Sequence, residues 1–204
     1  MSFYKCIVHS ARNCMRNFDV AYKALMVFEN GYANDPDDAG GETWKGIARN
    51  FNPNWPGWVI INEYKRKPKF PANLLDSVEL EELVQSFYKN KFWNVFKCDS
   101  LPYPIAEEIF EISVNMGIQQ ATKLIQRTCN LLNRNQKLYS DILVDGKFGL
   151  QTGATLERCI EVNSEKTVLN VLNILQGCFY VSLMEQKPVY EKYIGWFNRI
   201  EIRK

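Results

Sequence analysis

Apolar residues recur at spacings of three and four through most of this chain, and this period is the strongest constraint on its fold. The first such segment predicts an amphipathic helix over residues 18–30, with an apolar stripe that includes Phe18, Tyr22 and Leu25. Further helices are predicted over residues 58–65, 76–87, 104–117, 118–133, 152–160, 165–184 and 190–200. A fold that is mainly α-helical is therefore expected.

One stretch interrupts the helical pattern. Residues 32–47 are rich in Gly, Asp, Asn and Pro, which is typical of turns with one or two short strands. Gly31 is placed to end the first helix as a left-handed cap. Further along, Asp76 and Glu79 have the spacing of a capping box at the start of a helix.

Length, charge and composition limit the classes of protein to which this chain could belong. The chain has 204 residues, enough for one domain or two small ones, and its net charge of +2 is too small to indicate a nucleic-acid partner. No apolar run is longer than residues 24–28, so we expect no membrane insertion. The N-terminal residues lack the pattern of a secretory signal, which predicts synthesis in the cytoplasm. The six cysteines contain no CxxC pair, and reduced, buried thiols are the expected state.

Glu29 is the most informative polar residue of the interrupted region. It follows Leu25 by four positions, so a helix that continued to residue 30 would place its carboxyl group on the buried stripe. Burial and the negative end of the helix dipole both raise a carboxyl pKa, and a protonated carboxyl near neutral pH can act as a general acid. A structural carboxylate, paired with an Arg or a backbone donor, is the alternative that this pattern leaves open.

The turns after Glu29 could supply the second half of a hydrolytic site. Asp38 follows Glu29 by nine residues and Thr43 follows Asp38 by five, so a hairpin could bring both back across a cleft to orient a water molecule. Asp35 and Asp37 are alternatives to Asp38 as the base. A calcium-binding loop starting at Asp35 is excluded, because Ala39 and Gly46 occupy its fifth and twelfth positions. We expect no metal and no cofactor.

A family resemblance accompanies these residues. The stretch "ENGYANDPDDAGGETWKGIA" is similar to the signature of glycoside hydrolase family 108, which combines EGGY, NDPxDxGG and a Thr followed by a GI pair. Later segments resemble family elements in the same order, namely "SFYKNKFWN", "EISVNMG", "KLIQRTCN" with "VDGKFGLQT", and "YIGWFNRIEIRK". The resemblance runs from about residue 17 to the C-terminus.

The resemblance implies an N-acetylmuramidase of the phage endolysin or secretion-activator type. The implied fold is mainly α, lysozyme-like and two-lobed, with a small β-hairpin next to the catalytic helix. Residues 1–16 would be an N-terminal extension, 17–116 the catalytic region, and 117–204 a helical C-terminal region resembling a peptidoglycan-binding domain in the same globule. The implied site residues are catalytic Glu29, Asp38 and Thr43, and substrate-binding Tyr32, Asn34, Asp35, Gly41, Trp93 and Asn115.

Three residues depart from the family pattern. Asn30 replaces the first Gly after the acid, Trp44 stands beside Thr43 where a small or polar residue is common, and Leu150 replaces a Pro. The first two could alter sugar preference, and the third weakens the case for wall binding by the C-terminal half. Core packing is the alternative role for Trp93, and a structural hydrogen bond is the alternative for Asn115.

The expected partner is the glycan strand of peptidoglycan, bound by a monomer that acts on the cell wall or periplasm. Because no signal peptide is recognised, a holin or a secretion machinery is the expected route across the membrane. Two other functions stay open. A lytic transglycosylase would use the same acid without water, and a non-catalytic wall-binding or secretion-accessory protein would use the same fold.

Overall fold

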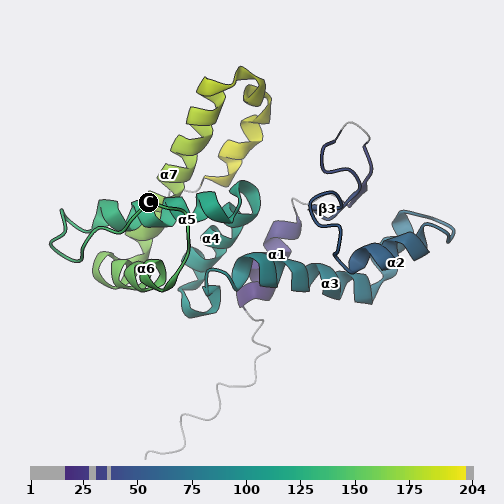
Figure 1. The fold of residues 1–204 in the computed structure, drawn as a ribbon, viewed down its shortest axis with the longest axis horizontal. Helices are drawn as coiled ribbons and strands as arrows, with labels where there is room; N and C mark the ends of the chain where they lie inside the picture. Colours follow the sequence, from purple (N-terminus) through teal and green to yellow (C-terminus); the bar gives the residue numbers. More distant parts are fainter. Residues whose placement is uncertain (1–16, 28–30, 36–37, 201–204) are drawn as a thin grey trace, which may run out of the picture. The chain divides into compact units, whose positions relative to one another are not determined.

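The computed structural model describes residues 17–27, 31–35 and 38–200. The chain forms two compact units that divide between Tyr88 and Lys89 (Figure 1). Each unit is described by itself below. This division falls before the predicted regional boundary at residues 116 and 117, because the helix that ends at Met116 packs on helices of the second unit.

The described residues of the first unit form three α-helices and a small sheet. Its helices are α1 (Asn17–Met26), α2 (Gly57–Tyr64) and α3 (Val78–Tyr88), with a 3₁₀ turn η1 (Ala72–Asp76) before α3. Its strands are β1 (Tyr32–Ala33), β2 (Thr43–Trp44) and β3 (Ile47–Ala48), paired antiparallel in the order β1-β2-β3. The prediction of turns with short strands is confirmed, with three two-residue strands.

Helix α1 is shorter than predicted. It ends at Met26, and the backbone N–H of Val27 reaches the carbonyl of Ala24 at 3.4 Å, which tightens the last turn. Val27 itself is 79% exposed. The predicted extension to residue 30 is therefore wrong for Val27, and Gly31 does not cap this helix. The predicted apolar stripe is confirmed, because Phe18, Tyr22 and Leu25 are all buried.

The start of α3 differs from the predicted capping box by one residue. The Ser77 hydroxyl accepts a hydrogen bond from the backbone N–H of Leu80 at 3.2 Å, so Ser77 and not Asp76 caps the helix. Asp76 is instead the last residue of η1. A side-chain oxygen three residues before an N–H is the usual geometry of an N-cap, and Ser77 alone has its side chain buried at the right place.

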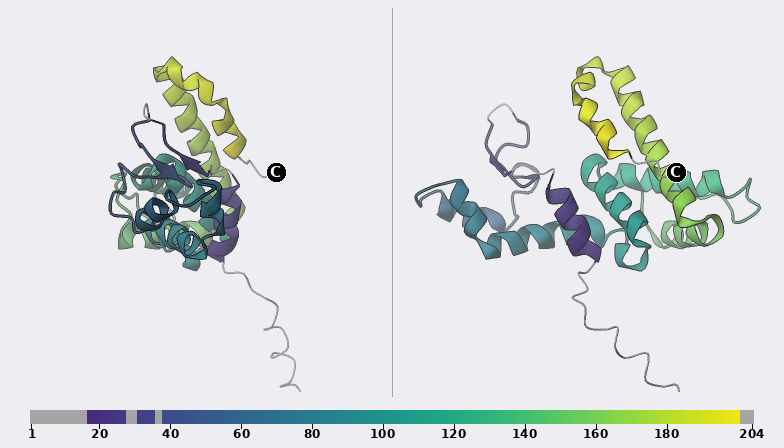
Figure 2. Two further views of the ribbon diagram at one scale, coloured as in Figure 1. Left: turned by 90° about the vertical axis from the view of Figure 1, so that its right-hand side faces the viewer. Right: turned by 180° about the vertical axis from the view of Figure 1, so that it is seen from behind.

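The second unit is almost entirely helical. Its α-helices are α4 (Tyr103–Met116), α5 (Ile118–Leu132), α6 (Leu150–Asn163) and α7 (Glu165–Gln186). Shorter helical turns are the π-helical η2 (Lys89–Trp93) and the 3₁₀ segments η3 (Cys98–Ser100) and η4 (Pro188–Arg199). Helix α7 packs against α4, α5 and α6, and η4 folds back along α7 (Figure 2). Four of the helices predicted for this half are confirmed as α4 to α7, whereas the one predicted over residues 190–200 is a 3₁₀ segment with a kink at Tyr193.

The loop between α5 and α6 is held by side chains of α5. The Gln126 amide accepts from the N–H of Gly146 at 2.9 Å and donates to Asp145 at 2.9 Å, which fixes the predicted "VDGKFG" turn. Gly146 has a φ of 74°, a value that favours glycine. At the other end of this loop, three successive residues that are not glycine, Arg134, Asn135 and Gln136, have φ values of 54°, 57° and 61°.

The cysteines of the described residues are free thiols. Cys98, Cys129 and Cys159 are buried and Cys178 is exposed, which agrees with the expected reduced state for these four. Cys6 and Cys14 lie outside the described residues. Helix α7 is long and apolar enough to cross a membrane by length and composition alone. Its buried face packs within the second unit, as the core helix of a globular protein does, so this property is weak evidence for a membrane span.

Candidate functional site

The predicted general acid, Glu29, and Asp37 lie outside the described residues. The chain segments on either side of position 29 are described, and both join the first unit. Before it, α1 is tied to α3 by a hydrogen bond of 2.8 Å from the Tyr22 hydroxyl to Glu81. After it, the carbonyl of Gly31 accepts from the N–H of Lys45 at 3.2 Å. The described segments before and after positions 28–30 are therefore both tied to Lys45 or Glu81.

Asp38, the predicted base, lies exposed in a tight turn. Its carboxylate accepts a hydrogen bond of 2.8 Å from the N–H of Gly40, and its carbonyl accepts one of 2.9 Å from Gly41. The N–H of Asp38 in turn donates to the carbonyl of Asp35 at 3.2 Å. Asn34 and Asp35 are also exposed. The carboxylate of Asp38 thus stabilises its own turn while facing solvent.

Thr43 and Gly41 belong to the same hydrogen-bonded turn as Asp38. The Thr43 hydroxyl, on β2, donates to the carbonyl of Gly41 at 3.2 Å. Gly41 has a φ of 63°, and a methyl group added there would lie 2.9 Å from the amide nitrogen of Asn50. The structure therefore brings Asp38, Gly41 and Thr43 together, with Gly41 in a conformation that side chains rarely adopt.

Behind this turn lies a buried ionic cluster that the sequence analysis missed. Glu42 is only 9% exposed, and its carboxylate contacts Arg49 and Lys65 at 2.7 Å each. Burial by itself would raise the pKa of Glu42, but hydrogen bonds from Lys65 and Tyr32 and the charge of Arg49 hold it below its ordinary value. The signal for this cluster was weak, since Glu42 looked like one more acidic residue of an exposed loop.

Tyr32, a predicted substrate contact, takes part in this cluster. Its ring packs edge-on against Phe70 with 4.7 Å between centroids. Burial, followed by the hydrogen bond to Glu42, raises the pKa of its hydroxyl to about 12. Because Tyr32 is half-buried and its hydroxyl faces Glu42, this residue stabilises the hairpin.

Trp93 and Asn115 belong to the second unit. Trp93 is fully buried, its indole N–H donates to Asp99 at 2.9 Å, and its ring packs edge-on against Phe110. With no exposed ring face, Trp93 cannot stack on a sugar, so the predicted substrate contact is corrected to core packing. Asn115 is exposed on α4, and its amide donates to the carbonyl of Glu111 at 2.9 Å.

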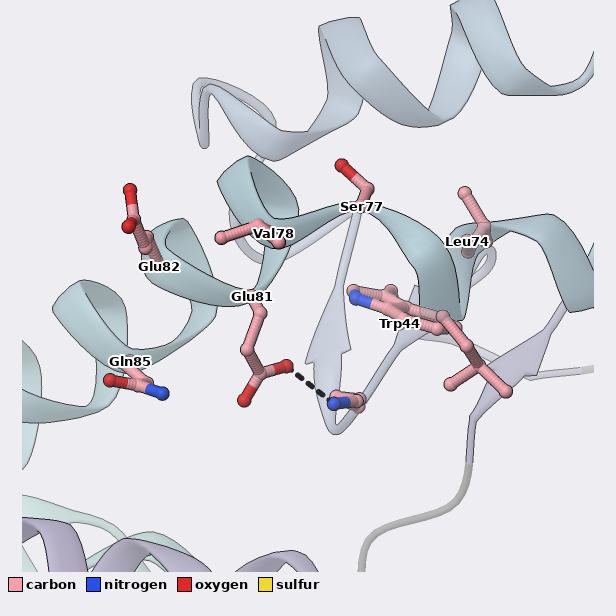
Figure 3. Close-up of a pocket in the computed structure, with 9 residues that line it drawn as sticks. Trp44, Leu74, Ser77, Val78, Glu81, Glu82 and Gln85 are labelled. Carbon is pink, nitrogen blue, oxygen red and sulfur yellow. Dashed lines mark hydrogen bonds and ion pairs between the residues drawn. The ribbon is translucent and has the colours of Figure 1, made fainter.

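A groove of about 520 Å³ opens between β2, η1 and α3 in the first unit (Figure 3). It is lined by Trp44, Lys45, Leu74, Leu75, Ser77, Val78, Glu81, Glu82 and Gln85. An ion pair of 2.5 Å joins Lys45 to Glu81 along one wall. Burial alone would raise the pKa of Glu81, but hydrogen bonds from Lys45 and Tyr22 keep it below its ordinary value. Within the described ranges, no three His, Cys, Asp or Glu side chains form a group that could hold a metal ion.

Comparisons with known proteins agree with this architecture. Residues 22–117 match the family described as Glycosyl hydrolase 108, and residues 120–201 match the one described as Predicted Peptidoglycan domain. Among solved structures, the chain resembles SagA from Brucella abortus with a TM-score of 0.56 and 18% identity, over 90% of this chain and 88% of that one. This likeness confirms the mainly α-helical, lysozyme-like fold class. None of the curated proteins matches the sequence significantly.

Proposed function

Because this chain belongs to glycosyl hydrolase family 108 and carries a C-terminal peptidoglycan-domain region, we propose that it is an N-acetylmuramidase. It would cleave the β-1,4 bond between N-acetylmuramic acid and N-acetylglucosamine in the glycan strand of peptidoglycan. The observation that carries the proposal is the hydrogen-bonded turn of Asp38, Gly41 and Thr43, which directly follows position 29 in the chain. The turn presents an exposed carboxylate and a hydroxyl on a backbone whose conformation is fixed.

Glu29 is the proposed general acid, which donates its proton to the bridging oxygen as the glycosidic bond breaks. Asp38 then accepts a proton from the attacking water, with Thr43 helping to orient it. In an inverting enzyme the two carboxyl groups are roughly 6.5–9.5 Å apart, which leaves room for that water. The N–H of Gly40 supports this role, because it holds the Asp38 carboxylate in one orientation.

Substitution of the acid tests the proposal directly. Glu29→Gln keeps the shape of the side chain but has no proton to donate, so lysis of purified peptidoglycan should fall by roughly 10²–10⁴-fold. Asp38→Asn should also reduce lysis strongly, whereas Glu63→Gln serves as the control, because Glu63 is exposed on α2 and is not a predicted site residue, so this variant should retain most activity. Clearing of wall suspensions by Glu29→Gln at the wild-type rate would contradict the proposal and favour the non-catalytic alternative.

The products separate hydrolysis from transglycosylation. Hydrolysis leaves a reducing muramic acid end, whereas a lytic transglycosylase leaves a 1,6-anhydro end that is lighter by one water, roughly 18 Da. Mass spectrometry of the digested wall should show the heavier end. The enzyme would act on the wall after passing the membrane with the help of a holin or a secretion machinery. Both routes can be compared by testing lysis in cells with and without each partner.

A further inference from the structure

The groove in Figure 3 is joined to both chain segments that flank the proposed acid. Glu81 in its wall accepts a hydrogen bond from Tyr22 of α1, the helix that precedes position 29. Lys45 in its wall donates its backbone N–H to Gly31, two residues after position 29. Two lining residues of the groove therefore contact the described residues that come before and after positions 28–30 in the chain.

Trp44 gives this groove an unused hydrogen-bond donor. The residue is only 3% exposed, yet its indole N–H has no hydrogen-bond partner. Three other buried tryptophans do have partners, since Trp55, Trp58 and Trp93 donate to Leu83, Asn52 and Asp99. A buried donor without an acceptor lowers stability, so the Trp44 indole is the exception that calls for an explanation. In Figure 3 its nitrogen end points towards Val78 and Glu81, across the groove.

The rest of the lining combines apolar and acceptor groups. Leu75 and Val78 are 71% and 73% exposed, and they form an apolar wall. The carboxylate of Glu81 is already used by Lys45 and Tyr22. Glu82 is exposed beside it, and the Gln85 amide completes the polar side. One donor, an apolar wall and a carboxylate acceptor match a ligand that carries a carbonyl oxygen, a methyl group and hydroxyl groups.

We propose that this groove binds an N-acetylated sugar of the glycan strand through its acetamido group, with Trp44 as the donor to the acetamido carbonyl. The acetamido methyl packs on Leu75 and Val78, and a sugar hydroxyl donates to Glu82. The indole nitrogen of Trp44 is shielded in the free protein, so a side chain of the groove wall has to rotate when the sugar binds. Val78 is the candidate, because it is the most exposed apolar side chain of that wall. This inference rests on the proposed function and identifies which chemical group the site recognises.

A cationic ligand such as a peptide amine fits the groove less well. An indole N–H repels a cation, and the ammonium group of Lys45 already occupies the strongest acceptor, Glu81. The chemistry of the lining thus favours the neutral acetamido group over the amine that remains when the acetyl group is removed.

The experiment uses the full chain with Glu29→Gln, so that a glycan is bound but not cleaved. The indole N–H signals are followed by nuclear magnetic resonance during titration with an N-acetylglucosamine trisaccharide. A second titration uses the same trisaccharide without acetyl groups. The Trp44 signal should move with the acetylated ligand and stay in place with the deacetylated one. This measurement needs no change at Trp44, so it does not depend on a variant that folds poorly.

Variants then test each contact. Trp44→Phe should weaken binding of the acetylated trisaccharide roughly five-fold, the effect of one neutral hydrogen bond. Glu82→Gln should weaken it by a similar or larger factor, because a charged acceptor is lost. Glu79→Gln is the matched control, since Glu79 lies on the same helix and does not line the groove. Its affinity should equal that of the parent.

Two results would overturn the inference: a Trp44 signal that stays in place at saturation with the acetylated ligand, or equal binding of both trisaccharides. These failures are distinct from failure of the proposed function, which is judged by wall lysis and product mass. A protein that binds acetylated sugar through Trp44 but never lyses walls would support the groove and refute the hydrolase.

Discussion

Glu42 forms ion pairs with two cations, Arg49 just after β3 and Lys65 at the end of α2. The guanidinium of Arg49 also packs over the ring of Trp58, 4.3 Å from its centroid, and donates to Asn62. This single buried carboxylate therefore joins the hairpin that carries Asp38 and Thr43 to the nearest helix. Removal of the Glu42 carboxylate should therefore destabilise this hairpin more than any other element.

We expect Glu42→Gln to lower the free energy of unfolding by about 2 kcal/mol, because two half-buried cations lose their counter-charge. Glu63→Gln is the matched control, since Glu63 pairs with Lys67 on the exposed face of α2. That change should cost less than about 0.5 kcal/mol. Urea unfolding of both variants checks the difference, and equal midpoints would contradict it.

The lowered pKa of Glu42 gives stability a definite dependence on pH. A carboxyl group whose pKa is lower in the folded state contributes full stability above its unfolded value, which is 4.5 for Glu42. As pH falls through the folded pKa, the contribution is lost. The difference in unfolding free energy between wild type and Glu42→Gln should therefore be constant at neutral pH and shrink below pH 4.5. A difference that grows on acidification would contradict this assignment.

Gly41 was predicted to contact substrate, and its positive φ also allows the backbone to form the turn. Gly41→Ala would place a methyl group at a φ of 63° and against the Asn50 amide, which itself donates to Ala39 at 3.1 Å. We expect a loss of about 1–2 kcal/mol and a fall in lysis, since the turn also positions Asp38 and Thr43. Gly149→Ala is the control, because its added methyl group would meet nothing within 4 Å. Thermal unfolding and wall lysis measured together test both effects.

Single residues also set the limit of prediction from sequence. The period of three and four identified the buried positions of α1, including Phe18, Tyr22 and Leu25, because burial repeats with the helix. It could not distinguish Trp93 in the core from a tryptophan in a cleft, since both are aromatic and both follow a helical pattern. Glu42 was missed for the related reason that its partners lie 7 and 23 residues away, a pairing that only the folded hairpin creates.

At the scale of elements, the N-terminus of α3 carries a specific prediction. Ser77→Ala removes the side-chain acceptor for the N–H of Leu80, which should cost about 1 kcal/mol. Asp76→Ala should cost less, because Asp76 belongs to η1 and does not cap α3. Urea unfolding gives both values. A larger loss for Asp76→Ala would restore the capping box predicted from sequence.

Element boundaries were predicted best where glycine or proline marks them. Helix α4 ends against Gly117, whose φ is 83°, and the pattern placed that end correctly. Helix α1 has no such residue near Met26, and its predicted end was too late. The segment 28–30 that follows lies outside the described residues, so the local setting of Glu29 stays a prediction from sequence.

At the scale of the whole molecule, the reactivity of the described cysteines reports on the packing of the second unit. Cys98, Cys129 and Cys159 are buried in the second unit, and burial raises the pKa of the Cys98 thiol to about 12. Cys178 is exposed on α7. Iodoacetamide should therefore label Cys178 in the native protein, and the three buried thiols only when the unit opens. Peptide mapping by mass spectrometry distinguishes these sites, and rapid labelling of Cys159 under native conditions would contradict the packing.

The spacing of apolar residues predicted the secondary structure of the second unit better than that of the first. The second unit is built from long periodic helices, so its elements were predicted almost completely. The first unit depends on two-residue strands and side-chain pairs such as Lys45 with Glu81, which leave little trace in a linear pattern. The candidate site belongs to this less predictable unit. Its motif was recognisable from sequence, whereas the geometry of its turn required the structure.

The backbone at Arg134, Asn135 and Gln136 offers a way to raise the thermostability of this protein. Of these residues, only asparagine accepts such dihedral angles readily, so the arginine and the glutamine hold the segment under steric tension. Arg134→Gly would relieve part of that tension, and the melting temperature should rise although no contact is added. The segment lies in the half of the chain remote in sequence from the proposed acid, so this gain in thermostability should leave the catalytic activity unchanged.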